Sequence, residues 1–166
     1  VLLHGPGKEL LNLTPNTLEE LLFDDIPFLK VAQEEHDAFA KILRDNGAEV
    51  VYLEKMMADV LDQNPELRET FLKQWIEEAG IRTDRYQKII YDYLNDSFPG
   101  SEELVMKTME GINLTELHTD KSNSLIDLVS DSSKLVCAPM PNLYFTRDPF
   151  ATIGNGVSIN RMYADT

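Results

Sequence analysis

The sequence predicts an α/β domain that is interrupted by an all-helical insertion. Strand, helix and strand patterns follow one another over residues 1–53, the order that builds a sheet covered by helices. Helical patterns without a strand then succeed one another over 56–134, and strand patterns return after that. We therefore expect an α/β core over 1–55 and 135–166, with the insertion over 56–134.

The first part of the core has clear local signals. Val1-Leu2-Leu3-His4 is typical of a short buried strand, which Gly5-Pro6-Gly7 ends. A helix is predicted by apolar residues at helical spacing, and Asn46-Gly47 supplies the left-handed residue that ends it. These apolar residues are Phe28, Val31, Ala32, Phe39, Ile42 and Leu43. Glu49–Leu53 follows as the second strand.

The insertion is predicted to be a small helical bundle. Asn64-Pro65 begins one helix, Thr83 caps the next, and Ser101 opens a third after Pro99-Gly100. Each helix repeats apolar residues on one face. The apolar sets are Leu67, Phe71, Trp75, Ile76 and Ala79, then Tyr86, Ile89, Ile90, Tyr93 and Leu94, then Leu104, Val105, Met109 and Ile112, and last a shorter stretch at Leu125, Ile126, Leu128 and Val129.

Strand character returns at Lys134–Ala138 and ends at Pro139 and Pro141, which lack a backbone donor. Two further strand patterns flank Asn155-Gly156, the dipeptide favoured in a two-residue hairpin turn. The chain is therefore expected to finish in sheet.

Composition excludes several classes of protein. A formal charge of -14 without a basic cluster argues against nucleic acid as a partner, because such binding depends on phosphate neutralisation. The sequence shows no long apolar run or signal peptide, so we expect a cytoplasmic protein without membrane contact. The chain starts without Met and stops at Ala164-Asp165-Thr166, and we expect it to be a piece of a longer protein.

The stretch from Pro139 to Pro149 is the best candidate for a ligand site. It lies between two predicted strands, and rigid prolines, an amide, aromatics, a cation and a carboxylate are combined in it. Asn142, Phe145 and Asp148 recur every third residue, so a turn-like backbone could point all three the same way. In the alternative, Asp148 pairs with Arg147 or caps a turn, and Phe145 is ordinary core. The residues alone leave both open.

Other chemically capable residues are weaker candidates. Cys137 lies in an apolar strand, where burial would raise the pKa of the thiol, and we interpret it as a core residue. His4, His36 and His118 are isolated in sequence and none has a metal-ligand spacing, so we expect no metal and no cofactor. The pair Asp24-Asp25 is better explained as acids before a helix than as a substrate site.

Two motifs resemble one family. Asn142–Ala151, followed by Ile153–Val157, resembles the signature of bacterial arginine deiminases. Leu10–Pro15, Leu21–Pro27 and Gln33–Asp37 are similar to the N-terminal region of the same family, and the helical insertion agrees in position. One departure is Gly5, where the family's turn would carry a basic residue.

The resemblance implies part of a five-bladed, pseudo-symmetric α/β propeller and a substrate site for L-arginine. It implies that Asp148 is catalytic and binds the guanidinium with both oxygens, and that Phe145 packs on the guanidinium plane. It also implies that Asn142 helps to hold the amino-acid end of the substrate and that Leu22 lines the pocket. A homo-oligomer is possible. Family members hydrolyse arginine to citrulline and ammonia through a cysteine thiolate, and the nucleophile would lie after Thr166.

Two hypotheses about function follow. In the first, the parent protein is an arginine deiminase and this chain supplies one guanidinium-binding carboxylate. In the second, the chain is a truncated, non-catalytic module for folding, binding or assembly. Both hypotheses predict that the chain alone lacks turnover.

Overall fold

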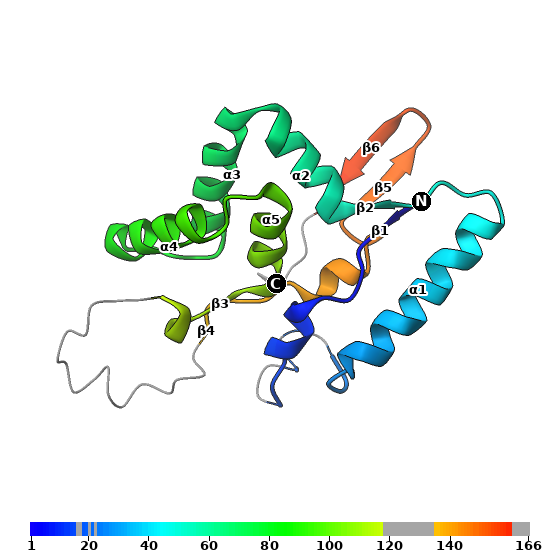
Figure 1. Ribbon diagram of the computed structural model, residues 1–166, viewed down its shortest axis with the longest axis horizontal. Helices are drawn as coiled ribbons and strands as arrows, with labels where there is room; N and C mark the ends of the chain where they lie inside the picture. Colours follow the sequence, from blue (N-terminus) through cyan, green and yellow to red (C-terminus); the bar gives the residue numbers. More distant parts are fainter. Residues whose placement is uncertain (16–17, 20, 22, 118–134, 161–166) are drawn as a thin grey trace. The chain divides into compact units, whose positions relative to one another are not determined.

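The computed structural model describes residues 1–15, 18–19, 21, 23–117 and 135–160 (Figure 1). Contacts divide the chain into two compact units: Val1–Met57 with Met140–Thr166, and Ala58–Pro139. In the described ranges, α helices are combined with three two-stranded sheets, which is compatible with the predicted α/β class. The predicted helical insertion over 56–134 stays a prediction as a separate domain.

The first unit is built on a parallel strand pair joined through a helix. Strand β1 (Leu2–Leu3) pairs with β2 (Val51–Tyr52), Leu2 opposite Val51. Between them, α1 (Leu29–Asp45) ends at Asn46, whose side-chain amide donates to the Ile42 carbonyl at 2.8 Å. Gly47 follows with φ 83°, a conformation that glycine adopts without steric cost. The predicted strand–helix–strand order and the predicted helix end are confirmed.

The apolar stripe predicted on α1 is only partly buried. Four of its members are exposed in this chain: Phe28 (71%), Val31 (43%), Phe39 (50%) and Ile42 (60%). Their helical spacing is as predicted, and among the described residues this face of the helix is largely exposed. Within the same unit, a small apolar cluster forms around Leu10, Leu13 and Leu21, next to the 3-10 helix η1 (Lys8–Asn12).

The hairpin turn is shifted by one residue from its predicted place. β5 (Phe150–Ile153) and β6 (Gly156–Ile159) are antiparallel, with Ile153 opposite Gly156. The two turn residues are therefore Gly154-Asn155 and not Asn155-Gly156. Gly154 takes φ 58° at the first turn position, where a two-residue hairpin of this kind requires a positive φ. Both dipeptides suit such a turn, so local sequence could not choose between them.

The second unit is a bundle of helices around one apolar core. α2 (Leu53–Gln63) runs into it from the first unit, and α3 (Pro65–Glu78), α4 (Asp84–Ser97) and α5 (Ser101–Glu110) follow. The Asn64 side chain accepts from the Glu66 amide at 3.2 Å, which confirms the predicted cap of α3. The predicted stretch at Leu125–Val129 lies outside the described residues. The buried apolar residues are Ala58, Leu61, Leu72, Trp75, Ile76, Ile90, Leu94, Leu104, Val105, Met109, Ile112, Leu117 and Cys137.

The expectation of a strand-free insertion was wrong at Ile112. α5 ends at Glu110, Gly111 takes φ 78°, and β3 (Ile112–Asn113) pairs antiparallel with β4 (Leu135–Cys137). The predicted strand at β4 is confirmed, but it pairs within the helical unit and not within the core. A Cβ on Gly111 would lie 2.7 Å from the Cys137 carbonyl oxygen and 2.8 Å from the Pro139 nitrogen, so only glycine fits there.

A partly buried ion pair lies beside β3 in the second unit. The Lys107 ammonium, on a side chain that is almost fully buried, lies 2.6 Å from Glu116, which also accepts from the Tyr93 hydroxyl at 3.0 Å. Burial alone would raise the pKa of Glu116, but the Asn113 amide and Lys107 outweigh it and hold that pKa below its usual value. Buried charges of this kind persist only when they are paired.

A second buried ionic group, centred on His4, joins three elements of the first unit. The Nδ1 atom of His4 lies 2.9 Å from Glu54 at the start of α2, and Nε2 lies 3.4 Å from Glu9 in η1. His4 and Glu9 are fully buried and Glu54 nearly so. Burial alone would lower the pKa of His4, but the two carboxylates outweigh burial and raise it to about 9.

We predict that His4 stabilises the fold as a cation. A histidine whose pKa is raised from 6.5 to about 9 contributes stability that is complete below pH 6.5 and is lost as pH rises through 9. His4→Gln should therefore lower the free energy of unfolding by up to about 3 kcal/mol near pH 6, and the deficit should shrink toward pH 10. Denaturant unfolding of both proteins from pH 6 to 10 checks this.

The stabilities of His4→Gln and the wild type are compared only between pH 6 and 10, because other groups titrate below that range. The pKa of His36 is lowered, chiefly by burial, so His36 destabilises the fold as pH falls below 6.5. Both proteins carry His36, so this effect largely cancels in the difference between their free energies of unfolding. Glu54 has a lowered pKa and loses its contribution only at acid pH. A deficit that does not change between pH 6 and 10 would show that His4 is not held as a cation.

Candidate functional site

The loop that carries Asn142, Phe145 and Asp148 has a continuous turn-like backbone. It begins with the 3-10 helix η3 (Pro141–Tyr144), with proline at its first turn. The Phe145 amide donates to the Asn142 carbonyl at 2.9 Å, and the Asp148 amide donates to the Phe145 carbonyl at 3.0 Å. The three candidate residues are thus joined by two consecutive i to i+3 bonds. The turn-like backbone that the sequence predicted is confirmed.

Three contacts tie this loop to the N-terminal part of the unit. The Asn142 side-chain amide donates to the Leu21 carbonyl at 3.1 Å, and the Thr146 hydroxyl donates to the Leu2 carbonyl of β1 at 3.0 Å. The Tyr144 ring lies 6.0 Å from the ring of His36 in α1. The two long motifs found in the sequence therefore meet in space. Leu22, the fourth predicted site residue, lies outside the described residues.

The loop presents a carboxylate and an aromatic ring to solvent. Asp148 is exposed, and Phe145 is 49% exposed with its ring edge-on to Tyr144 at 5.4 Å. The structure gives no ion pair between Asp148 and Arg147, two residues that it describes. Phe145 is not core either. A carboxylate and an aromatic face are the kinds of group that interact with planar cations.

Cys137 is unsuited to nucleophilic chemistry. Its side chain is 1% exposed in β4, and burial raises the pKa of the thiol to about 12, with Lys107 lowering it only in part. A thiol with that pKa has almost no thiolate at neutral pH, and thiolate is the reactive form. The interpretation of Cys137 as a core residue is confirmed.

Sequence reasoning missed the role of His4, which it treated as isolated. The residue lies between Glu9 and Glu54, and Glu54 is fifty positions away in the sequence. The sequence did contain a signal for this contact. His4 directly follows β1, and Glu54 is the second residue after β2. The ends of parallel strands meet at one edge of the sheet, which brings these two residues together. Among the described residues, no group of three His, Cys, Asp or Glu is arranged to hold a metal ion.

The pair Asp24-Asp25 does not cap α1. Both are exposed, and the helix begins only at Leu29 with Phe28 as its N-cap residue. One oxygen of Asp25 accepts from the following amide of Ile26 at 2.7 Å. These acids are therefore part of the connection that leads to the helix, and the structure shows no substrate geometry for them.

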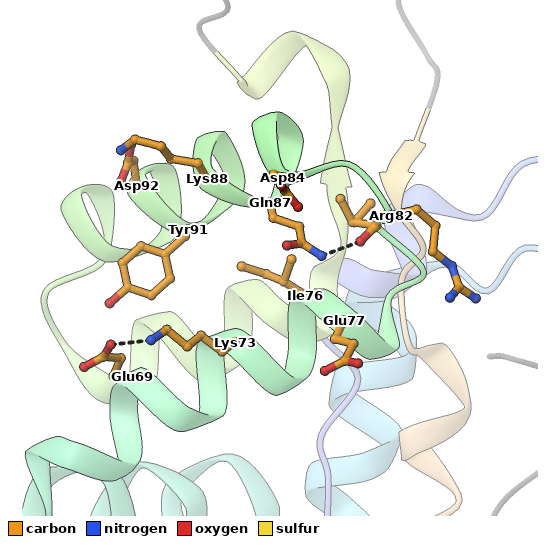
Figure 2. Close-up of a pocket in the computed structure, with 11 residues that line it drawn as sticks. Glu69, Lys73, Ile76, Glu77, Arg82, Asp84, Gln87, Lys88, Tyr91 and Asp92 are labelled. Carbon is orange, nitrogen blue, oxygen red and sulfur yellow. Dashed lines mark hydrogen bonds and ion pairs between the residues drawn. The ribbon is translucent and has the colours of Figure 1, made fainter.

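A groove of about 770 Å³ lies between α3 and α4 in the helical unit (Figure 2). Ile76, Ile81 and Tyr91 contribute apolar surface to it. Its other lining residues are charged or polar and alternate in sign: Glu69, Lys73, Glu77, Arg82, Asp84, Gln87, Lys88 and Asp92. Two of the three cations are already paired one helical turn away, Lys73 with Glu69 at 2.5 Å and Lys88 with Asp92 at 2.8 Å. The groove therefore offers no concentrated charge for a small ionic ligand.

Comparisons with known proteins agree with the two motifs. A sequence model of the family described as arginine deiminase matches residues 19–166. The chain is 61% identical over its whole length to a protein named arginine deiminase from Treponema denticola, and 50% identical to one of that name from Clostridium perfringens. A third, from Streptococcus pneumoniae, is 55% identical over 168 aligned residues. The chain spans 40% of the first two relatives and 41% of the third.

The helices give one further finding about the class of protein. No helix in the described ranges is both long enough and apolar enough to cross a membrane. The longest of them, α1, has 17 residues and is amphipathic.

We predict that Cys137 is protected from thiol reagents in the folded chain. Its pKa of about 12, against an ordinary value of 9.0, and its burial should slow disulfide exchange at pH 8 by at least ~100-fold relative to the chain unfolded in urea. Absorbance of the released thiol measures both rates. Equal rates in the two states would show that Cys137 is accessible and would reopen its assignment.

Proposed function

Because the chain belongs to the arginine deiminase family, we propose that its full-length parent hydrolyses free L-arginine to L-citrulline and ammonia. The observation that carries the proposal is the loop of Asn142, Phe145 and Asp148, whose turns join an exposed carboxylate to a half-exposed ring three residues before it. This is the pair of groups that a planar, charged guanidinium requires.

Each loop residue has a distinct proposed role. The carboxylate of Asp148 accepts two N–H donors of the guanidinium and keeps the substrate charged and oriented, which makes it the catalytic residue of this chain. The Phe145 ring packs on the guanidinium plane. Asn142 and Leu22 line the site at the amino-acid end and along its wall. The bond from Asn142 to the Leu21 carbonyl joins this loop to the residue that directly precedes Leu22 in the chain.

The reaction itself needs groups that this chain does not contain. In the proposed mechanism a cysteine thiolate attacks the guanidinium carbon, the C–N bond to one terminal nitrogen breaks, and ammonia leaves after that nitrogen is protonated. Water then attacks the same carbon, and the thiolate leaves as citrulline forms. A histidine and a glutamate move the protons, and a second aspartate shares the work of Asp148. All of these residues belong to the remainder of the parent.

The proposal extends to architecture and setting. We place the first unit in a five-bladed α/β propeller, with residues 56–134 as a helical insertion. We propose that the parent acts in the cytoplasm, as a monomer or a homo-oligomer, without a cofactor and without nucleic acid as a partner. The acidic balance of 29 Asp and Glu against 15 Lys and Arg supports the last of these points.

We predict that Asp148 is required for turnover in the full-length protein. Asp148→Ala leaves the guanidinium without its counter-charge, a loss that typically costs ~2–5 kcal/mol, so kcat/KM should fall by at least ~30-fold. Asp148→Asn should be nearly as damaging, because the amide keeps the shape but loses the charge. Citrulline formation on the folded fraction, with melting curves beside it, checks both variants.

Asp45→Asn is the matched control for this experiment. Asp45 is another exposed acid of the same unit, and its partner is Lys41, one turn away on α1. Surface pairs of this kind contribute little, so turnover should stay near that of the wild type. If Asp148→Asn also keeps wild-type turnover and loses only thermal stability, then Asp148 steadies the loop and is not part of the active site.

We also predict that the 166-residue chain alone forms no citrulline, because its one cysteine is a buried thiol. The measurement is citrulline formation at saturating arginine, with the full-length parent as the positive control. Both hypotheses share this outcome, and they separate on the parent: turnover there supports the enzyme, and its absence supports a module for folding, binding or assembly. Activity of the short chain that Cys137→Ser abolishes would contradict the assignment of Cys137.

A further inference from the structure

One side chain fixes the candidate substrate loop to the sheet of the first unit. The Thr146 hydroxyl donates to the Leu2 carbonyl of β1 at 3.0 Å, across 144 positions of sequence. Thr146 is half-buried, so water competes weakly for this bond. It is the tether that lies closest in the chain to both Phe145 and Asp148.

Thr146 lies between Phe145 and Asp148 in the loop, so its hydrogen bond affects the position of both residues. The Asp148 amide donates to the Phe145 carbonyl, so residues 145–148 form one closed turn. Thr146 is the second residue of that turn, between the ring and the carboxylate. A hydroxyl held at this point fixes both neighbours at once. The Asn142 bond to Leu21 acts at the other end of the loop.

The acceptor of the bond is itself held in place. Leu2 pairs with Val51 in the parallel sheet, and His4, two residues later, is bracketed by Glu9 and Glu54. The Leu2 carbonyl therefore belongs to a strand that is fixed on the ladder and at its end. A donor on a flexible loop gains a defined position from such an acceptor.

We propose that Thr146 is a positioning residue for arginine hydrolysis: its hydroxyl holds the 145–148 turn on β1 in the register that the guanidinium needs. The inference rests on the proposed function, since it concerns how Phe145 and Asp148 meet the substrate. Thr146 touches no reacting atom. Its effect arises because a displacement of about 1 Å in a substrate-positioning group can cost ~100-fold in rate.

The test compares three variants of the full-length protein. Thr146→Val keeps the shape and removes the donor, and Thr146→Ser keeps the donor. Thr70→Val is the matched control, because Thr70 also donates its hydroxyl to a backbone carbonyl, that of Glu66 at 3.2 Å, on an exposed face of α3. kcat and KM for arginine are measured on the folded fraction, with melting temperatures.

The expected result is a loss of at least ~10-fold in kcat/KM for Thr146→Val, mostly in kcat, because misplaced groups still bind substrate but orient it poorly. The kcat/KM of Thr146→Ser should lie within about 3-fold of the wild-type value. The kcat/KM of Thr70→Val should equal that of the wild type. A structural role alone would lower the melting temperature of Thr146→Val and leave kcat and KM of the folded protein unchanged, which would overturn the inference.

Two further outcomes are decisive. If Thr146→Val does not fold, Thr146→Cys takes its place, because a thiol occupies similar space but is a weak donor; equal activity of Thr146→Cys and Thr146→Ser would overturn the inference. If the wild-type protein itself forms no citrulline, the proposed function fails. Full activity in the wild type and in Thr146→Val together leaves the function intact and removes Thr146 from it.

Discussion

The first unit is built around His4, which lies buried between two carboxylates. A parallel pair of two-residue strands is marginal by itself, since it has little ladder and little face to bury. His4 adds contacts between elements that the short ladder does not provide. One ring nitrogen contacts Glu9 in η1, and the other contacts Glu54 at the start of α2. Removing one partner of such a group leaves an uncompensated buried charge, which is far worse than never having had the group.

The carboxylates of this unit fall into two kinds. Glu9 and Glu54 are buried and both are paired with His4. One oxygen of Glu9 also accepts from the Gly7 amide at 2.6 Å, and its other oxygen has no hydrogen-bond partner among the described residues. Asp148 is exposed, with its loop bound through backbone and neighbouring side chains instead of through its own oxygens. The structural acids are thus neutralised inside the protein, and a negative charge remains at the surface loop that both motifs converge on.

Local signals in the sequence predicted local structure well. The cap at Asn64, the helix end at Asn46-Gly47 and the turn-like backbone of the 142–148 loop were found, because each is encoded within a few residues. The hairpin was found with its turn one residue away, since two adjacent dipeptides both suit such a turn. For these features, the pattern and its structural cause lie in the same stretch of chain.

Features that depend on distant partners could not be predicted in the same way. β3 has only two residues and pairs with a strand more than twenty positions away, so its apolar Ile112 was assigned to the preceding helix. The stripe on α1 has helical spacing, but spacing does not say what covers a face. The bond from Thr146 to Leu2 leaves no trace in either motif, because a threonine hydroxyl has many possible acceptors.

Gly111 shows how a residue without a side chain can be required by the backbone that packs against it. It has no room for a methyl group, and the atoms that block it are backbone atoms of Cys137, Ala138 and Pro139, which cannot rotate away as a side chain can. Pro139 is followed directly by Met140 and by the loop with Asn142. Any larger residue at position 111 would push on the segment from which that loop departs. The position is therefore restricted to glycine by backbone packing alone, so intolerance to substitution does not by itself mark a residue that takes part in chemistry.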